Sequence, residues 1–502
     1  MLTVAGIFSE EFSDEDFDRP RWCGGSNYTT LRKENASSTG HSIIYHDADT
    51  GHEECLVDLK SLIPPRSENP LTINDYSLST DRSKVLIFTE AQKVWRFLTR
   101  GRYWILDLKT SSLWQLGLSD DDPIEKASLL MFATFSPTAD RVAYVREHNI
   151  YVQDLSTRAI TQLTKDGSDM IINGTFDWVY EEEFHLLNGF RWSPDGTTIA
   201  FWQLDQSDVP IVYLFNNTDG KYPRLIPIPY PKTGDINPSA KVGVISTCGE
   251  QPVTWLTLSD DTRNNYVVAL DFMKKDGQIL VQTMNRLQNK IDISLADPTS
   301  SFQDVQLLFT DTDECWVDKP TKPLMWVNDE AEFIYISERN QWKQIFLISK
   351  DTKRCVQLTP DGVDVVEFAG YDQVTGVLYY IASPHNPTRR FLYRISLDGT
   401  GNMRVTPEGK KHFEYKSSLK GVLLVLGGKG CILLSTFPLL PSSSLFLPLP
   451  SYSFPFPPSS SLFLPLLPFP VYALPLPVYA PPSSSLFLHA LLLHIPNNYY
   501  SV

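Results

Sequence analysis

The fold is decided by a segment that opens with Phe135-Ser136-Pro137, runs through Arg141-Val142-Ala143-Tyr144-Val145 and Asn149-Ile150-Tyr151-Val152, and closes at Thr161-Gln162-Leu163-Thr164. It contains a turn, two short strands, an Asp turn and a third strand. The same order recurs along the chain, at residues 79–116, at 332–359 and from Trp192-Ser193-Pro194-Asp195-Gly196 onward. A period of about 40–50 residues with about four short strands is typical of a β-propeller blade.

Two β-sandwich domains are the alternative architecture for a chain with so many short strands. Sandwiches have no reason to repeat the Ser-Pro turn and the Gln-Leu close. A single blade cannot bury both of its faces, so several blades must stack around a channel. We therefore expect an all-β protein, with a propeller over residues 1–415.

Composition excludes several classes of function. The 502 residues carry a formal net charge of −15, without a basic stripe, which argues against a nucleic-acid binder. The six cysteines are scattered, with no CxxC pair or zinc spacing, so we expect no metal site, no cofactor and no dense disulfide framework. The N-terminus lacks the pattern of a signal peptide or membrane anchor. The cytoplasm is therefore the default expectation, and the sequence does not decide the compartment.

The C-terminal part has a different composition. We expect a transition over residues 416–430 and a low-complexity tail over 431–502, where Pro-Ser-Ser-Ser-Leu-Phe-Leu occurs three times. Phe, Leu, Ser and Pro are the residues that pyrimidine-only codons specify, so our hypothesis is translated non-coding sequence. Its frequent prolines disfavour a membrane-spanning helix and predict a disordered tail.

The run Asp177-Trp178-Val179-Tyr180-Glu181-Glu182-Glu183-Phe184 places three adjacent carboxylates behind an aromatic segment. Neighbouring acids repel one another, so such a cluster is either well solvated or held for a cation. A solvated surface loop is the simpler interpretation of a bare Glu triplet. A protonated amine is the simplest cationic partner, and the Trp and Tyr favour a fixed platform for it.

The acidic run resembles the Asp-Trp-x-Tyr-Glu-Glu-Glu motif of the dipeptidyl peptidase IV family of prolyl-oligopeptidase-type serine peptidases. The resemblance extends over about residues 5–415. It is supported by Ile172-Asn173-Gly174-Thr175, Asn74-Asp75-Tyr76-Ser77, Lys93-Val94-Trp95-Arg96 and Pro227-Ile228-Pro229-Tyr230-Pro231-Lys232. It implies an eight-bladed N-terminal propeller followed by an α/β-hydrolase domain, and the release of X-Pro or X-Ala dipeptides from free peptide N-termini.

The resemblance also implies roles for single residues. Glu182 and Glu183 would bind the α-ammonium of the substrate, and Arg96 would hold a substrate carbonyl and orient the two acids. Two carboxylates facing one ammonium select a free amine over an internal peptide bond. Asp177, Trp178, Tyr180 and Glu181 are expected to shape the segment. The partners are therefore peptide N-termini, with no nucleic acid and no membrane segment.

The catalytic half of the family is not found in the sequence. No G-x-S-x-G nucleophile elbow occurs, Gly427-Gly428-Lys429-Gly430 is most simply a turn, and none of the nine histidines lies in a catalytic context. We expect a propeller truncated before the hydrolase domain, without catalytic residues and inactive as written. The family's homodimer, which involves that domain, is not expected here.

Two other functions stay open. One is a non-catalytic propeller that binds peptides or proteins. The other is a non-functional product whose propeller is unclosed and whose tail is sticky.

Overall fold

The computed structural model describes residues 3–7, 20–33, 40–65, 67–119, 128–249, 251–302, 304–319, 324–384, 388–406, 424–427 and 431–434. The predicted transition and tail therefore lie outside the described residues, apart from two short strands. The chain divides into two compact units, residues 1–438 and 439–502, and the fold described below belongs to the first.

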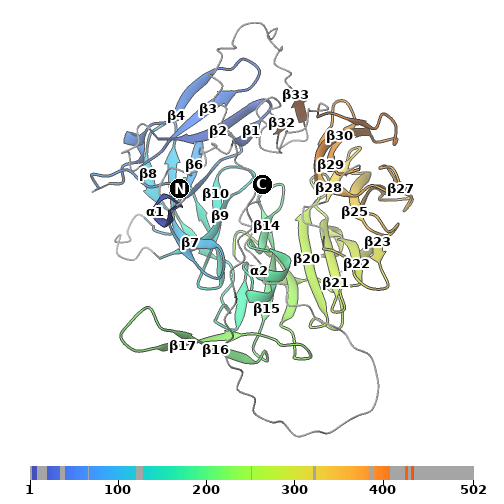
Figure 1. Ribbon diagram of the computed structural model, residues 1–502. Helices are drawn as coiled ribbons and strands as arrows, with labels where there is room; N and C mark the ends of the chain where they lie inside the picture. The colour runs from blue at the N-terminus through green and yellow to red at the C-terminus, as the bar shows by residue number, and fades with distance from the viewer. Residues whose placement is uncertain are drawn as a thin grey trace, which may run out of the picture. The chain divides into compact units, whose positions relative to one another are not determined.

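The described chain is built almost entirely of antiparallel sheets that follow one another in sequence order, from β1–β4 to β28–β31 (Figure 1). This confirms the predicted all-β propeller architecture. After the short helix α1 (Val4–Ile7), the first sheet contains β1 (Arg21–Gly24), β2 (Asn27–Arg32), β3 (Ser42–Asp47) and β4 (Glu53–Val57). A 3₁₀ turn, η2 (Leu59–Leu62), leads to the next sheet.

The second and third four-stranded units share one eight-stranded sheet because β7 pairs with β9 at Gly101 and Leu130. The second unit contains β5 (Asp75–Leu78), β6 (Lys84–Lys93), β7 (Leu98–Asp107) and β8 (Leu113–Gln115). The third contains β9 (Leu130–Phe135), β10 (Arg141–Arg146), β11 (Asn149–Asp154) and β12 (Ile160–Gln162). Strands β6 and β7 are ten residues long, which lets them reach beyond their own unit.

The fourth sheet carries two insertions. Its strands are β13 (Ile171–Asn173), β14 (Phe190–Trp192), β15 (Thr198–Asp205), β18 (Ser239–Ser246) and β19 (Thr254–Trp255). Helix α2 (Trp178–Phe184) lies between β13 and β14 in the chain, and the hairpin of β16 (Ile211–Asn216) and β17 (Arg224–Pro229) lies between β15 and β18. The hairpin exposes large apolar side chains, among them Tyr213 and Phe215.

Three regular four-stranded sheets follow. The fifth contains β20 (Asn265–Phe272), β21 (Ile279–Asn285), β22 (Lys290–Ala296) and β23 (Val305–Thr312), with the 3₁₀ turn η4 (Pro298–Ser300). The sixth contains β24 (Met325–Val327), β25 (Glu332–Ser337), β26 (Gln344–Ser349) and β27 (Cys355–Gln357). The seventh contains β28 (Val365–Asp372), β29 (Val377–Ala382), β30 (Phe391–Ser396) and β31 (Met403–Arg404). A last pair joins β32 (Leu424–Gly427) to β33 (Cys431–Leu434).

The repeated serine turn has the same hydrogen bonds in three of the four-stranded units. The Ser136 hydroxyl donates to Asp140 at 2.8 Å and accepts from the amide of Arg141 at 3.1 Å. Ser193 and Ser79 make the equivalent pairs of bonds in their own turns. A single hydroxyl thus closes the turn between two strands, which explains why the sequence repeats Ser at this position.

The repeated Gln-Leu-Thr close also has one explanation. The Gln162 amide donates to the carbonyl of Thr164 at 2.9 Å, and the Thr164 hydroxyl accepts from the amide of Ile150 at 2.9 Å. Gln357 and Thr359 repeat both bonds in the sixth sheet, at 2.8 and 3.0 Å. In these two units the outer strand is therefore held by side chains where its backbone ladder ends.

The core lies between neighbouring sheets. One cluster joins Val145 and Ile150 of the third unit to Phe190 and Phe201 of the fourth, and similar clusters join the first to the second, the second to the third, and the sixth to the seventh. The largest cluster connects the fourth, fifth and sixth sheets and includes Tyr180 of α2. Burying each of these side chains contributes about 1.5–3 kcal/mol. The acidic helix is thus part of the core that holds the sheets together.

Candidate functional site

The acidic run forms a seven-residue helix, α2, on a loop that leaves and rejoins the fourth sheet at one point. The amide of Gly189 donates to the carbonyl of Gly174 at 3.0 Å, and a Cβ on Gly189 would lie 2.7 Å from the Gly174 carbonyl carbon. Glycine at 189 therefore permits this close approach of two backbones. The two ends of the loop are therefore held close together, which fixes the position from which the helix starts.

Both ends of α2 are capped. The Asp177 carboxylate accepts from the amide of Tyr180 at 3.0 Å, as an N-cap residue does. At the other end His185 has a left-handed backbone (φ 53°), and the amide of Leu186 donates to the carbonyl of Tyr180 at 3.2 Å. The Lys319 ammonium donates to the carbonyl of Phe184, where a positive charge also complements the helix dipole. Burial lowers the pKa of Lys319 to about 8.

Tyr180 anchors the helix to the fifth sheet. Its hydroxyl accepts from the amide of Val267 at 3.1 Å, and the indole of Trp202 donates to the Val267 carbonyl at 2.9 Å. The register of β20 against β21 shifts just after Val267, so side chains of the fourth sheet bond the backbone at this bulge. Phe176 stacks on Tyr180 and meets the edge of Trp202. The aromatic residues of the motif thus hold the helix rigidly.

Trp178 and Asp177, which were expected to shape the segment, make different contacts. The Trp178 ring contacts the Tyr230 ring, with centroids 4.5 Å apart, which braces the helix against the segment that follows β17. Burial raises the pKa of Asp177 to about 6, and its second oxygen has no hydrogen-bond partner among the described residues. Both side chains act on the position of the helix.

The three glutamates differ in environment. Glu181 is buried, Glu182 has a side chain that is 10% exposed, and Glu183 is exposed. Oε2 of Glu182 accepts a hydrogen bond from Nε of Arg96 at 2.8 Å and lies 2.6 Å from Nη2 of the same guanidinium. In the described part of the chain, Oε1 of Glu182 accepts no hydrogen bond and Glu183 makes no ion pair. Two carboxylates are therefore available to a cation.

Glu181, which was expected to shape the segment, is 3% exposed. Burial, followed by the charge of Glu182, raises the pKa of Glu181 to about 7. The nearby backbone amides of Phe97 and Arg96 oppose this rise. Glu181 therefore lies close to the loop between β6 and β7 that carries Arg96. The sequence placed Glu181 in an acidic triplet but gave no sign that it faces inward.

Arg96 brings two distant parts of the chain together. It lies in the loop between β6 and β7, its side chain is 70% exposed, and it reaches across 86 positions in sequence to Glu182. Ion pairing with Glu182 raises the pKa of Arg96 further above its ordinary value. The predicted association of Arg96 with the acidic run is thus a direct contact in the structure.

Within the described residues, no group of three or more His, Cys, Asp or Glu side chains is arranged to hold a metal ion. The cysteines at 23, 248, 315 and 355 form no disulfide in that part of the chain. None of the described helices is long and apolar enough to cross a bilayer.

Comparison with known proteins matches residues 79–429 to the family described as the dipeptidyl peptidase IV (DPP IV) N-terminal region. A probable dipeptidyl-aminopeptidase B of Aspergillus oryzae is 28% identical over 362 residues, which is 67% of this chain and 39% of that protein. The dipeptidyl-aminopeptidase B of Aspergillus niger is 29% identical over 357 residues, or 66% of this chain and 39% of that protein. The chain thus spans about two fifths of the length of these relatives.

Solved structures show the same fold. The dipeptidyl peptidase 4 of Porphyromonas gingivalis superposes with a TM-score of 0.71 at 25% identity, covering 80% of this chain and 55% of that one. A putative dipeptidyl aminopeptidase IV of Bacteroides ovatus gives a TM-score of 0.58 at 16% identity, covering 76% and 52%. The second likeness supports the fold alone.

Proposed function

This chain belongs to the dipeptidyl peptidase IV family through its N-terminal region, and we propose that helix α2 binds the free α-ammonium of a peptide. Glu182 and Glu183 supply the carboxylates, and Arg96 orients Glu182 and donates to a backbone carbonyl of the peptide. Peptides with Pro or Ala at the second position are the proposed ligands. The role is recognition at the entrance to a peptidase site.

The proposal rests on one observation: Arg96 contacts only one of the two carboxylate oxygens of Glu182. Arg96 contacts only Oε2, and Oε1 lies on a side chain that is 10% exposed. A weakly solvated oxygen next to a fixed arginine is a strong acceptor for a second cation, because hydrogen bonds between charged groups are about twice as strong as neutral ones. Glu183 adds a second negative charge on the same helical turn.

The rigid mounting of α2 supports a measuring role. Caps at both ends and the Tyr180 contact with β20 fix the helix, so an amine held there starts the peptide at a constant point. A bond two residues along the peptide would then always lie at the same distance from the helix. Such a fixed anchor favours dipeptide release over cleavage at other positions.

The experiment compares a free and a blocked N-terminus on the 502-residue chain. We expect Ala-Pro-Gly-amide to bind in calorimetric titration, and N-acetyl-Ala-Pro-Gly-amide to bind at least about 10-fold more weakly, because acetylation removes the charge. Glu182→Gln should weaken binding of the free peptide about 10–100-fold, by removing a hydrogen bond between charged groups. Glu183→Gln should weaken it less, since Glu183 is the more exposed acid.

Glu68→Gln is the matched control, because Glu68 is exposed and lies in the segment that precedes the second sheet. It should bind the free peptide as the unchanged chain does. Equal affinity for free and acetylated peptides, or equal effects of the substitutions at 182 and 68, would refute the amine site.

A second candidate is a peptide-binding propeller without catalysis, and the sequence favours it in one respect: it contains no G-x-S-x-G. We propose that residues 1–502 recognise peptides without hydrolysing them. Incubation with Ala-Pro-p-nitroanilide should release no p-nitroaniline above the background rate. Release that depends on a serine of this chain would overturn that part of the proposal.

A further inference from the structure

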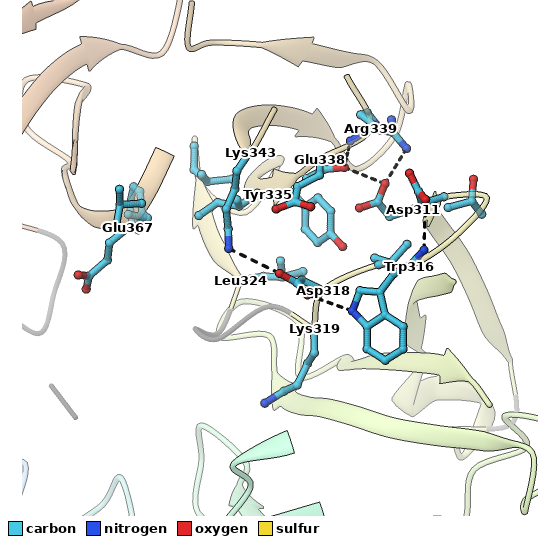
Figure 2. A pocket seen from close by; sticks show the side chains of 18 of the residues that line it. Asp311, Trp316, Asp318, Lys319, Leu324, Tyr335, Glu338, Arg339, Lys343 and Glu367 are labelled. Carbon is cyan, nitrogen blue, oxygen red and sulfur yellow. Dashed lines mark hydrogen bonds and ion pairs between the residues drawn. The ribbon is translucent and has the colours of Figure 1, made fainter. Parts of the chain in front are cut away.

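A hollow of about 90 Å³ lies where the fifth, sixth and seventh sheets meet, and one of its lining residues, Lys319, contacts the acidic helix (Figure 2). Its walls come from the end of β23 and the residues after it, from β24 and β25, and from the start of β28. Five acidic and three basic side chains line it: Asp311, Asp313, Asp318, Glu338 and Glu367, with Lys319, Arg339 and Lys343. The lining is therefore negative overall.

Arg339, the arginine of the hollow, is already paired within the protein. Arg339 lies 3.3 Å from Asp311 and donates to the carbonyl of Thr310 at 3.0 Å, and its guanidinium covers the Phe309 ring at 4.6 Å. Asp311, which is 4% exposed on its side chain, also accepts from the Ser337 hydroxyl at 2.8 Å. Arg339 and Asp311 thus neutralise one another in the wall.

The two lysines neutralise little of the remaining charge. Lys319 donates to the Phe184 carbonyl of α2, outside the hollow. Lys343 comes no closer than 4.0 Å to Asp318, whose carboxylate also accepts from the indole of Trp316 at 3.1 Å. Glu338 makes no ion pair in the described part of the chain. Glu338 and Asp318 therefore leave negative charge for a ligand.

A buried polar group faces the same space. Tyr335 is 1% exposed, and its hydroxyl makes no geometrically well-formed hydrogen bond among the described residues, although burial and the nearby Asp311 carboxylate raise the pKa of Tyr335. Figure 2 shows its ring in the middle of the lining, between Glu338 and Trp316. A buried hydroxyl without a good hydrogen bond destabilises the folded chain, so it marks a place where a ligand can supply the missing hydrogen bond.

Trp316 gives the hollow an aromatic wall. It is 53% exposed, which is unusual for so large an apolar side chain, and its indole nitrogen is fixed by Asp318. An exposed aromatic face beside carboxylates attracts cations, and guanidinium groups also stack on it.

We propose that this hollow binds a basic side chain of a peptide, with its guanidinium or ammonium between Glu338, Asp318 and the Tyr335 hydroxyl and its alkyl stem on Trp316. The site is separate from the amine site on α2 and does not depend on it. A peptide could use either site alone.

N-acetyl-arginine-amide tests the hollow without engaging the amine site, because its α-amine is blocked. We expect it to bind the 502-residue chain in a ligand-observed NMR titration, and its neutral isostere N-acetyl-citrulline-amide to bind at least about 5-fold more weakly. Glu338→Gln and Trp316→Ala should each weaken binding of the arginine probe about 3-fold. Both residues are exposed, so the fold should tolerate these changes.

Tyr335→Phe separates binding from folding. It should weaken binding of the arginine probe about 3-fold or more but leave the thermal midpoint unchanged or raised, because the lost hydroxyl made no well-formed hydrogen bond among the described residues. Glu68→Gln and Glu182→Gln are controls that should leave the affinity for the probe unchanged. Equal affinity for arginine and citrulline, or equal effects of the substitutions at 338 and 68, would overturn the proposal. Loss of free-amine binding in Glu182→Gln with the arginine probe unaffected would support two separate sites.

Discussion

Two arginine–carboxylate pairs join distant parts of this chain, and they are built in opposite ways. At α2 the acid is nearly buried and the arginine is 70% exposed, with both of its contacts on one oxygen of Glu182. In the wall of the hollow, Arg339 is 27% exposed and Asp311 is 4% exposed, and a serine and two aromatic rings complete the pair.

The difference separates a pair that holds structure from a pair that is open to ligands. Asp311 has donors on its own sheets and needs none from outside. Glu182 keeps an oxygen without a donor in the described part of the chain. We propose that the same two chemical groups serve stability in one place and recognition in the other.

The largest effect on stability should come from breaking the Arg339–Asp311 pair. Arg339→Met keeps an apolar stem over the phenylalanine rings but leaves Asp311 buried beside Ser337 alone. We expect the free energy of unfolding to fall by about 2–3 kcal/mol, since removing one partner strands a buried charge. Differential scanning calorimetry should show a midpoint lower by a few degrees.

The double variant Arg339→Met with Asp311→Asn is the control. It removes the stranded charge and should recover part of the lost stability. If Arg339→Met alone is as stable as the unchanged chain, the Arg339–Asp311 pair contributes as little to stability as the Arg96–Glu182 pair.

A smaller effect of opposite sign is expected at Glu181, whose pKa is raised from 4.5 to about 7. Between these values the folded chain binds more protons than the unfolded chain, so stability falls as the pH rises through this window. Glu181→Gln removes the penalty and should be more stable than the unchanged chain at pH 8, by about 1–2 kcal/mol after allowance for screening by solvent. Thermal midpoints of the two chains should converge at pH 4, and a constant difference across the pH range would contradict the assignment.

The smallest effect on stability should come from breaking the Arg96–Glu182 pair. Arg96→Met removes an exposed partner, and exposed ion pairs contribute about 0–1 kcal/mol. We expect a change in the free energy of unfolding below about 1 kcal/mol, together with weaker binding of Ala-Pro-Gly-amide. A loss of stability as large as that of Arg339→Met would remove the contrast between the pairs.

The sequence predicted most of the features that recur from one four-stranded unit to the next. Ser136, Ser193 and the Gln-Leu-Thr close each make local hydrogen bonds within one hairpin, so their recurrence revealed the four-stranded unit directly. The acidic run stood out as a fixed platform, and its contact with Arg96 is present. Its helical form was not predicted, although Asp177 is a recognisable N-cap. The predicted roles of Glu182, Glu183 and Arg96 in binding stay predictions.

The hollow could not be predicted, because it depends on contacts between sheets. Asp311 and Arg339 are 28 positions apart, and no local pattern shows that the Tyr335 hydroxyl makes no well-formed hydrogen bond among the described residues. Charge counts along the chain treat Glu181 and Glu183 alike, and only packing separates them. Features that depend on one sheet meeting another need the structure.

The hydrogen bond between Tyr180 and Val267 offers a way to monitor helix α2. The amide of Val267 donates to a side chain of α2, so we expect its exchange with deuterated water to be slow only while α2 keeps its place. Detachment of the helix would expose this amide before the surrounding strands open. A peptide that fixes the helix should therefore slow exchange at Val267 selectively, which makes occupancy of a surface site readable deep within the protein.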